Sequence, residues 1–214
     1  MDGGAIDGGW YLAVLAFARE TPWLQGFLAI YTNAGLVLLA LLAVATWWRM
    51  RGRDAKRMAA ALWVPLAVAL AYGLSNLVKV LVQEPRPCIR YPSVPTVATC
   101  DYATDYSFPS NHVTLAFAAA VALLFAARRT GLVALGLALL VACSRVYLGA
   151  HYPHDVLVGA ILGTLVACLA LPLRRPMTAI VVRLRDGGLR PLVGAGADGL
   201  PAAGFADPVD QVRR

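Results

Sequence analysis

Three short polar clusters interrupt a mostly apolar chain, and their residue types suit phosphate chemistry. They contain, in order, Lys79, Arg86 and Pro87; Pro109, Ser110, Asn111 and His112; and Ser144, Arg145, His151 and Asp155. Cations bind phosphate oxygens, and a histidine beside a carboxylate can act as a nucleophile or a base. Because each cluster lies at the edge of an apolar segment, the pattern predicts phosphate chemistry at a membrane surface.

The composition predicts a membrane protein in one domain. Of the 214 residues, 59% are hydrophobic and only 14% are charged, against about a quarter in soluble domains. The mean hydropathy is +0.65. On a soluble chain, the net charge of +7 would suggest binding to nucleic acid. In this apolar chain it is better explained by the excess of Lys and Arg in the cytoplasmic loops of membrane proteins. We therefore expect a bilayer and a lipid as partners and no nucleic acid; the oligomeric state stays open.

Five apolar stretches are long enough, or nearly so, to cross a bilayer as helices, which takes about 20 residues. They are residues 24–48, 59–82, 112–127, 131–148 and 155–173. Residues 9–19 are apolar but short, and nearby Trp10, Tyr11 and Trp23 favour an interfacial or re-entrant helix. The sequence predicts an all-α transmembrane bundle of five spans plus this N-terminal helix.

The basic residues predict the orientation of the bundle. Most of the 19 Lys and Arg residues follow the first, third and fifth stretches, at 49–57, 128–129 and 174–214. With five alternating spans these positions share one side, which the positive-inside rule makes cytoplasmic. The polar clusters then face outward. We assign residues 1–176 to the membrane domain and 177–214 to a cytoplasmic tail, with an amphipathic helix at 177–185 and a largely flexible remainder.

The longest outer loop, residues 83–110, contains five prolines and two cysteines. The prolines exclude regular helix and central strand. An oxidising exterior permits a disulfide between Cys88 and Cys100, and two free thiols are the alternative.

Each cluster also has a simpler interpretation. Lys79, Arg86 and Arg145 could extend towards lipid headgroups, but three cations beside polar motifs on the sparsely basic side fit that poorly. Ser110 could be an ordinary helix N-cap, although the unpaired N–H groups of a first turn also bind anions. Together with the cations, this helix start predicts a phosphate site.

The third cluster supplies the candidate nucleophile. Pro153 is suited to begin a helix, which places Asp155 in its first turn, within reach of His151. A carboxylate bonded to one imidazole nitrogen leaves the other as nucleophile or base. A plain helix-capping role for Asp155 is the alternative. For His154 we prefer an interfacial position without a catalytic role.

Metal chemistry is a competing interpretation of the same residues. The sequence has no His-x-x-x-His pair, no Asp-x-Asp pair and no Walker loop, and the neighbouring cations would repel a metal. We therefore predict phosphoryl transfer without a metal and without a cofactor.

The clusters resemble the signature of the type 2 phosphatidic acid phosphatase superfamily, the lipid phosphate phosphatases. That signature reads Lys-x6-Arg-Pro, Pro-Ser-Gly-His and Ser-Arg-x5-His-x3-Asp, and this sequence departs from it only at Asn111. The resemblance implies that His151 attacks phosphorus, Asp155 orients His151, and His112 protonates the leaving oxygen and then activates water. It also implies a phosphate site made by Lys79, Arg86, Ser110, Asn111 and Arg145.

The longer runs at 107–112 and 145–156 are similar to bacterial undecaprenyl-diphosphate phosphatases of this superfamily. They imply hydrolysis of undecaprenyl diphosphate on the outer face of a bacterial plasma membrane, for peptidoglycan synthesis. Phosphatidylglycerol phosphate, phosphatidic acid and a polyprenyl-phosphosugar phosphate are rival substrates. Vanadate haloperoxidases share the pocket pattern but are soluble as a rule. A lipid transporter or a non-catalytic lipid-phosphate binder is the alternative outside enzymes.

Overall fold

The computed structural model describes residues 3–100 and 105–196. Over these residues the chain is helical and has no strand, so the predicted all-α class is confirmed there. The helices are α1 Gly3–Glu20, α2 Pro22–Met50, α3 Ala55–Val82, α4 Pro87–Arg90, α5 Asn111–Ala126, α6 Arg128–Tyr147, α7 Pro153–Cys168, α8 Ala170–Asp186 and α9 Arg190–Val193.

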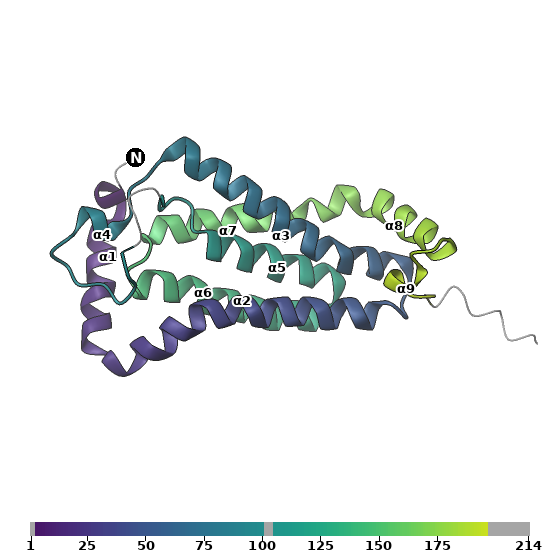
Figure 1. Ribbon diagram of the computed structural model, residues 1–214, viewed down its shortest axis with the longest axis horizontal. Coiled ribbons are helices and arrows are strands. Elements are labelled where there is room, and N and C mark those ends of the chain that lie inside the picture. Colours follow the sequence, from purple (N-terminus) through teal and green to yellow (C-terminus); the bar gives the residue numbers. More distant parts are fainter. Residues whose placement is uncertain (1–2, 101–104, 197–214) are drawn as a thin grey trace, which may run out of the picture.

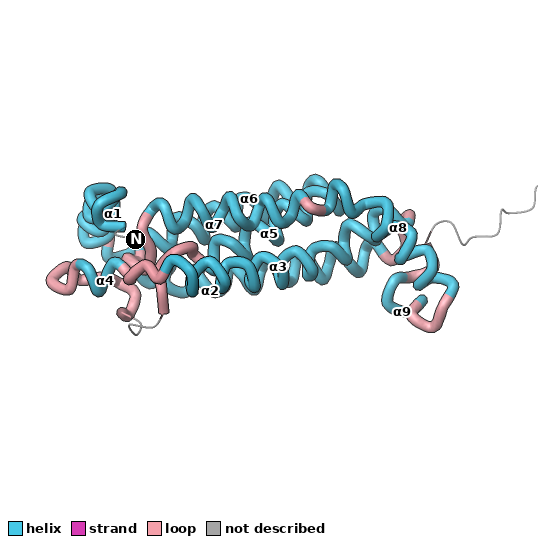
Figure 2. Tube along the Cα trace, turned by 90° about the horizontal axis from the view of Figure 1, so that it is seen from above, coloured by secondary structure: helices cyan, strands magenta, loops and turns pink. Residues whose placement is uncertain are grey.

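The long helices form an elongated bundle with two different ends. Helices α2, α3, α5, α6 and α7 run along the long axis, and α8 continues beyond α7 (Figure 1). Helix α1 crosses one end of the bundle, whereas α9 lies at the other, and the view turned by 90° shows the same arrangement (Figure 2). We call these the α1 end and the α9 end.

Helix α5 is the centre of the bundle and contacts α2, α3, α6 and α7. Its buried side chains are mostly alanines, which allow neighbouring helices to approach closely. At Gly163 of α7 an added Cβ would lie 2.3 Å from the Thr114 carbonyl oxygen of α5. Trp63 of α3 donates a hydrogen bond of 2.9 Å to the Ala167 carbonyl, which ties α3 to α7. Small residues therefore set the spacing around α5.

Three of the described helical segments are long and apolar enough to cross a membrane: α2, residues 55–90 around α3, and α6. The bent pair α7 and α8 can supply a fourth span. Helix α5 is apolar but has only 16 residues, about 24 Å at the α-helical rise, which is shorter than a bilayer core. The chain is a multi-pass membrane protein, and the expected count of five spans stays a prediction.

The last expected span differs from the structure. We expected one helix over 155–173, but α7 ends at Cys168 and α8 begins at Ala170 with a bend of 41°. Pro172 explains the break, because proline cannot donate to the carbonyl four residues earlier and its ring crowds that carbonyl. The amphipathic helix expected at 177–185 is correspondingly longer, since α8 starts at Ala170 and passes through Pro176.

The loop between α3 and α5 also differs from the expectation. Its prolines do not exclude helix entirely, because Pro87 occupies the first position of α4, where a missing N–H costs nothing. Cys88 and Cys100 are joined by a disulfide with a Cα–Cα distance of 5.8 Å.

The basic residues gather at the α9 end. Lys56 of α3 lines the same surface hollow as Arg174 and Arg175 of α8. Part of the expected flexible tail is packed here, because Trp47 donates a hydrogen bond of 3.1 Å to the Leu192 carbonyl of α9. The rest of that tail, residues 197–214, lies outside the described residues.

The close approach of α5 and α7 predicts a specific packing defect. Gly163→Ala should destabilise the bundle by about 1–3 kcal/mol, because the methyl group meets backbone atoms of α5. Gly136→Ala on α6 is the matched control, since its added Cβ meets nothing within 4 Å. Thermal unfolding of both variants in detergent measures the difference, and equal melting temperatures would contradict this account of the packing.

Candidate active site

The three polar clusters, which are separate in sequence, meet at the α1 end. Arg86 donates a hydrogen bond of 3.3 Å to the Ala150 carbonyl, which joins the first cluster to the third. The backbone N–H of Ser110 donates to the Asp155 carbonyl at 3.1 Å, which joins the second to the third. The site is thus built where α3 and α6 end and α5 and α7 begin (Figure 1).

The carboxylate of Asp155 is fully buried and lies beside His151. One of its oxygens, Oδ2, lies 3.4 Å from His151 Nδ1 and accepts a hydrogen bond of 2.8 Å from the Tyr152 N–H. The same oxygen accepts the hydroxyl proton of Ser107. The carboxylate therefore faces Nδ1 of the imidazole and does not contact Nε2.

His151 lies in the turn between α6 and α7 and is only 2% exposed. The pKa of His151 is lowered to about 3, mainly by burial and also by the nearby Arg145 charge, although Asp155 opposes the shift. The imidazole is therefore neutral at physiological pH. A neutral imidazole is the form that can attack an electrophile.

Lys79 and Arg86 are both largely buried and share a carboxylate partner, Asp105. Lys79 Nζ lies 3.6 Å from Asp105 Oδ1. Arg86 donates to the carboxylate of Asp105 and, at 3.0 Å, to its backbone carbonyl. Burial alone would raise the pKa of Asp105, but the charges of Arg86 and Lys79 outweigh it and hold that pKa below its ordinary value. An anionic group thus lies between two of the predicted phosphate-binding cations.

Ser110 precedes α5 as its N-cap but does not cap it with its side chain. Its hydroxyl is buried and has no hydrogen-bond partner among the described residues. Backbone N–H groups of the first turn of α5 are unpaired in the same place. A hydroxyl, free N–H groups and the positive end of the helix dipole are groups that favour an anion.

Helix α2 supplies partners for two predicted site residues. Arg145 donates a hydrogen bond of 3.1 Å to Thr32, and His112 Nε2 lies 3.1 Å from the Asn33 side-chain oxygen.

The Asn111 side chain, which replaces the glycine of the signature, points towards α3. It accepts from Ser75 at 2.5 Å and donates to Asn76 at 3.0 Å. The side chain of Asn111 is therefore held by α3.

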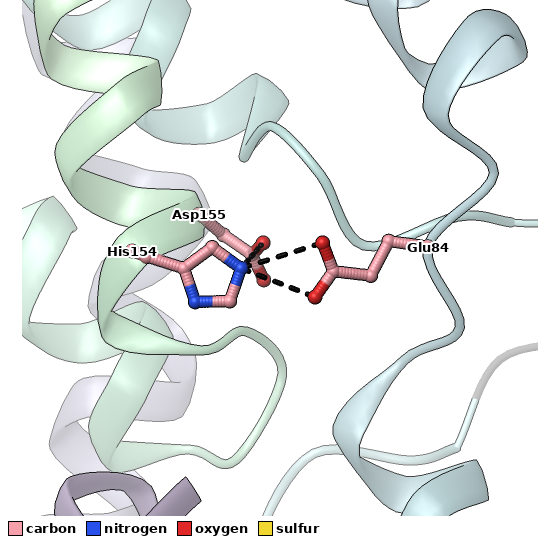
Figure 3. A group of neighbouring side chains, drawn as sticks. All are labelled: Glu84, His154 and Asp155. Carbon is pink, nitrogen blue, oxygen red and sulfur yellow. Dashed lines mark hydrogen bonds and ion pairs between the residues drawn. The ribbon is translucent and has the colours of Figure 1, made fainter. Parts of the chain in front are cut away.

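His154 is not a simple interfacial residue. Its Nε2 lies 3.1 Å from Glu84 Oε1 and 3.3 Å from Asp155 Oδ1, and Figure 3 shows this nitrogen directed at both carboxylates. Its Nδ1 lies 2.9 Å from Asp7 of α1. One ligand atom from each of Glu84, His154 and Asp155 lies within 4.8 Å of the others, a spacing that a metal ion could also use. The predicted absence of a metal stays a prediction.

Sequence reasoning missed several side chains that complete the site. They are Asp7, Thr32, Asn33, Ser75, Asn76, Glu84, Asp105 and Ser107. Thr32-Asn33 and Ser75-Asn76 are polar pairs within otherwise apolar spans, and intramembrane polar residues are a signal of function that could have found them. The contacts of Asp7 and Glu84 with His154 bridge about 147 and 70 sequence positions and have no local signature.

Comparison with known proteins agrees with this geometry. Residues 60–177, more than half of the chain, match the PAP2 superfamily. The chain is 28% identical over 180 residues to "Undecaprenyl-diphosphatase BcrC" of Bacillus subtilis, over 82% of this chain and 90% of BcrC. It is 36% identical over 155 residues to "Putative undecaprenyl-diphosphatase YbjG" of Escherichia coli, over 71% of this chain and 73% of YbjG.

Among solved structures, the crystal structure of Aquifex aeolicus LpxE superposes with a TM-score of 0.63. The match covers 78% of this chain and 95% of LpxE, with 24% sequence identity. At this identity the likeness concerns the fold of the helix bundle.

The low pKa of His151 predicts that its imidazole does not take up a proton near neutral pH. The imidazole should stay neutral from pH 9 down to pH 5, because its pKa of about 3 lies below this range. Nitrogen-15 NMR of histidine-labelled protein can test this, since the chain has three histidines and His151→Gln identifies the signal. A titration midpoint between pH 6 and 7 would refute the buried neutral state.

The position of Asp105 predicts competition with phosphate. Asp105→Asn should lower the inhibition constant of orthophosphate roughly twofold to fivefold, the range for partly exposed ion pairs, because the carboxylate no longer neutralises Lys79 and Arg86. Asp186→Asn at the end of α8 removes the same charge at the α9 end and is the control. Weaker inhibition of Asp105→Asn than of the control would show that Asp105 helps to build the anion site.

Proposed function

The chain belongs to the PAP2 superfamily and is a lipid phosphatase, and from this premise we propose that it hydrolyses undecaprenyl diphosphate to undecaprenyl phosphate and orthophosphate. The reaction takes place at the outer face of a bacterial plasma membrane, uses no metal and passes through a phosphohistidine. The observation that carries the proposal is the contact of His151 Nδ1 with Asp155, which leaves Nε2 as the nucleophile.

In the first step His151 Nε2 attacks the terminal phosphorus. The new P–N bond forms as the bond between phosphorus and the bridging oxygen breaks, and His112 donates a proton to that oxygen. Lys79, Arg86 and Arg145 hold the equatorial oxygens, where charge is stabilised in the transition state. Ser110 and the backbone N–H of Asn111 add donors from the start of α5.

In the second step water hydrolyses the phosphohistidine. His112, now neutral, takes a proton from water as the water oxygen attacks phosphorus. The P–N bond breaks, orthophosphate leaves, and His151 returns to its neutral state. Asp155 stabilises the orientation of His151 throughout, and it does not need to accept a proton.

The choice of undecaprenyl diphosphate as substrate rests on two relatives that are named undecaprenyl-diphosphatases. BcrC and YbjG match 82% and 71% of this chain, and the match to the PAP2 superfamily over residues 60–177 includes the three clusters between 79 and 155. Phosphatidylglycerol phosphate, phosphatidic acid and polyprenyl-phosphosugar phosphates remain rival substrates for the same site, because the phosphate group makes the contacts proposed above.

The outer orientation rests on the distribution of charge. The proposed site lies at the α1 end, whereas the basic residues at the start of α3 and those of α8 lie at the α9 end. The positive-inside rule makes the α9 end cytoplasmic. The C-terminus is then cytoplasmic, and the disulfide between Cys88 and Cys100 lies on the oxidising side.

Phosphate release by purified protein in detergent with EDTA tests the proposal. The panel contains undecaprenyl diphosphate, undecaprenyl phosphate, phosphatidic acid and phosphatidylglycerol phosphate. We expect the diphosphate to be hydrolysed with the highest kcat/KM, and His151→Ala to lose activity by at least about a thousandfold, as expected for a nucleophile.

The outcomes separate the parts of the proposal. Preference for a glycerolipid would replace the substrate but keep the mechanism. Loss of activity in EDTA, with recovery on adding a divalent cation, would contradict the metal-free reaction. Ligand binding without phosphate release from any lipid would favour a non-catalytic binder.

A further inference from the structure

His154 contacts three carboxylates from three different parts of the chain, two through hydrogen bonds and one through an ion pair. Asp7 comes from α1, Glu84 from the segment after α3, and Asp155 from the first turn of α7. The side chains of Glu84 and Asp155 are fully buried, and that of Asp7 is 13% exposed. The ring also stacks on Tyr152 and Phe108, with ring centroids 5.5 Å and 5.8 Å away.

Two buried carboxylates so close together require a positive charge or a proton between them. A neutral imidazole has one N–H, so it could donate on only one side and would direct a lone pair at a carboxylate on the other. An imidazolium has two N–H groups. One matches Asp7 at 2.9 Å, and the other matches Glu84 at 3.1 Å. The second nitrogen also lies 3.3 Å from Asp155 Oδ1, an ion-pair contact, and Figure 3 shows it with Glu84 and Asp155.

The ring is the expected place for the proton, because imidazole is a stronger base than a carboxylate. Asp7 fixes the residue further, because its other oxygen accepts the His154 backbone N–H at 2.7 Å. The N-terminus of α1 packs directly onto the group, since a Cβ at Gly3 would lie 2.0 Å from Glu84 Oε1. Helix α1 therefore covers the cluster.

We propose that His154 is a positioning residue, which as an imidazolium holds Asp155 against His151 and couples that carboxylate to Glu84 and to Asp7 of α1. His154 Nε2 forms an ion pair of 3.3 Å with Oδ1 of Asp155, an oxygen without a hydrogen bond among the described residues, while Ser107, Tyr152 and His151 contact Oδ2. In the proposal, the charge on His154 holds the oxygen that no hydrogen bond holds. The kinetic test of this inference rests on the proposed hydrolysis. A second test, by NMR, therefore uses protein without substrate.

The kinetic test compares two substitutions of His154. His154→Gln keeps an N–H donor near Glu84 and Asp155 but removes the charge, whereas His154→Leu removes both. We expect kcat to fall about tenfold for glutamine, as for other outer partners of a functional histidine–carboxylate pair, and further for leucine. KM should stay unchanged, because His154 contacts none of the predicted phosphate-binding residues.

The link to α1 has its own matched pair of variants. Asp7→Asn should lower kcat, and Glu20→Gln should not, because Glu20 is exposed at the opposite end of the same helix. Equal kcat values for the leucine and glutamine variants of His154, or a change in KM alone, would overturn the positioning role. Equal activity of Asp7→Asn and Glu20→Gln would overturn the coupling to α1.

Nitrogen-15 NMR of unliganded protein tests the charge directly, even if no tested lipid is a substrate. We expect both ring nitrogens of His154 to carry protons at pH 7, with and without EDTA, and Asp7→Asn to weaken this state. A ring with one proton would overturn the imidazolium. A signal that changes with EDTA, and returns with zinc, would replace it with a metal site made by Glu84, His154 and Asp155.

Discussion

The buried carboxylate of Asp155 is the interaction on which the rest of this site depends. It contacts His151, Ser107 and the Tyr152 N–H through one oxygen and His154 through the other, and its backbone carbonyl accepts from Ser110. An isolated buried carboxylate would be costly, so each of these donors must be in place. The loop before α5, the α6–α7 turn and the start of α7 are thereby held in one arrangement.

The apolar bundle makes this polar arrangement possible. Alanines of α5 and Gly163 of α7 allow close helix contacts, and the ends of four helices then bring cations, a hydroxyl and two histidines to the α1 end. Lys79 and Arg86 are satisfied by Asp105 and by backbone carbonyls in the unliganded protein. A phosphate group offers the same kind of acceptor with more charge, so it can replace Asp105 there.

Local spacing in the sequence was enough to predict the all-α class and the three clusters. Arg145, His151 and Asp155 are close in sequence. The turn between α6 and α7 and the start of α7 are therefore enough to bring them to the same end of the bundle. Local spacing failed where the partner lies far away in sequence, as with Asp7 and Glu84 beside His154. It also failed at Pro172, which ends α7 within an apolar stretch that hydropathy alone treats as continuous.

The most direct measurement of the central claim is the detection of phosphate on His151 during turnover. Protein mixed briefly with lipid substrate carrying a labelled terminal phosphate, stopped in alkali and digested, should carry acid-labile label on the peptide containing His151. His112→Ala, in which water is poorly activated, should accumulate more of it. Label on another residue, or turnover with no labelled peptide in either protein, would contradict the account.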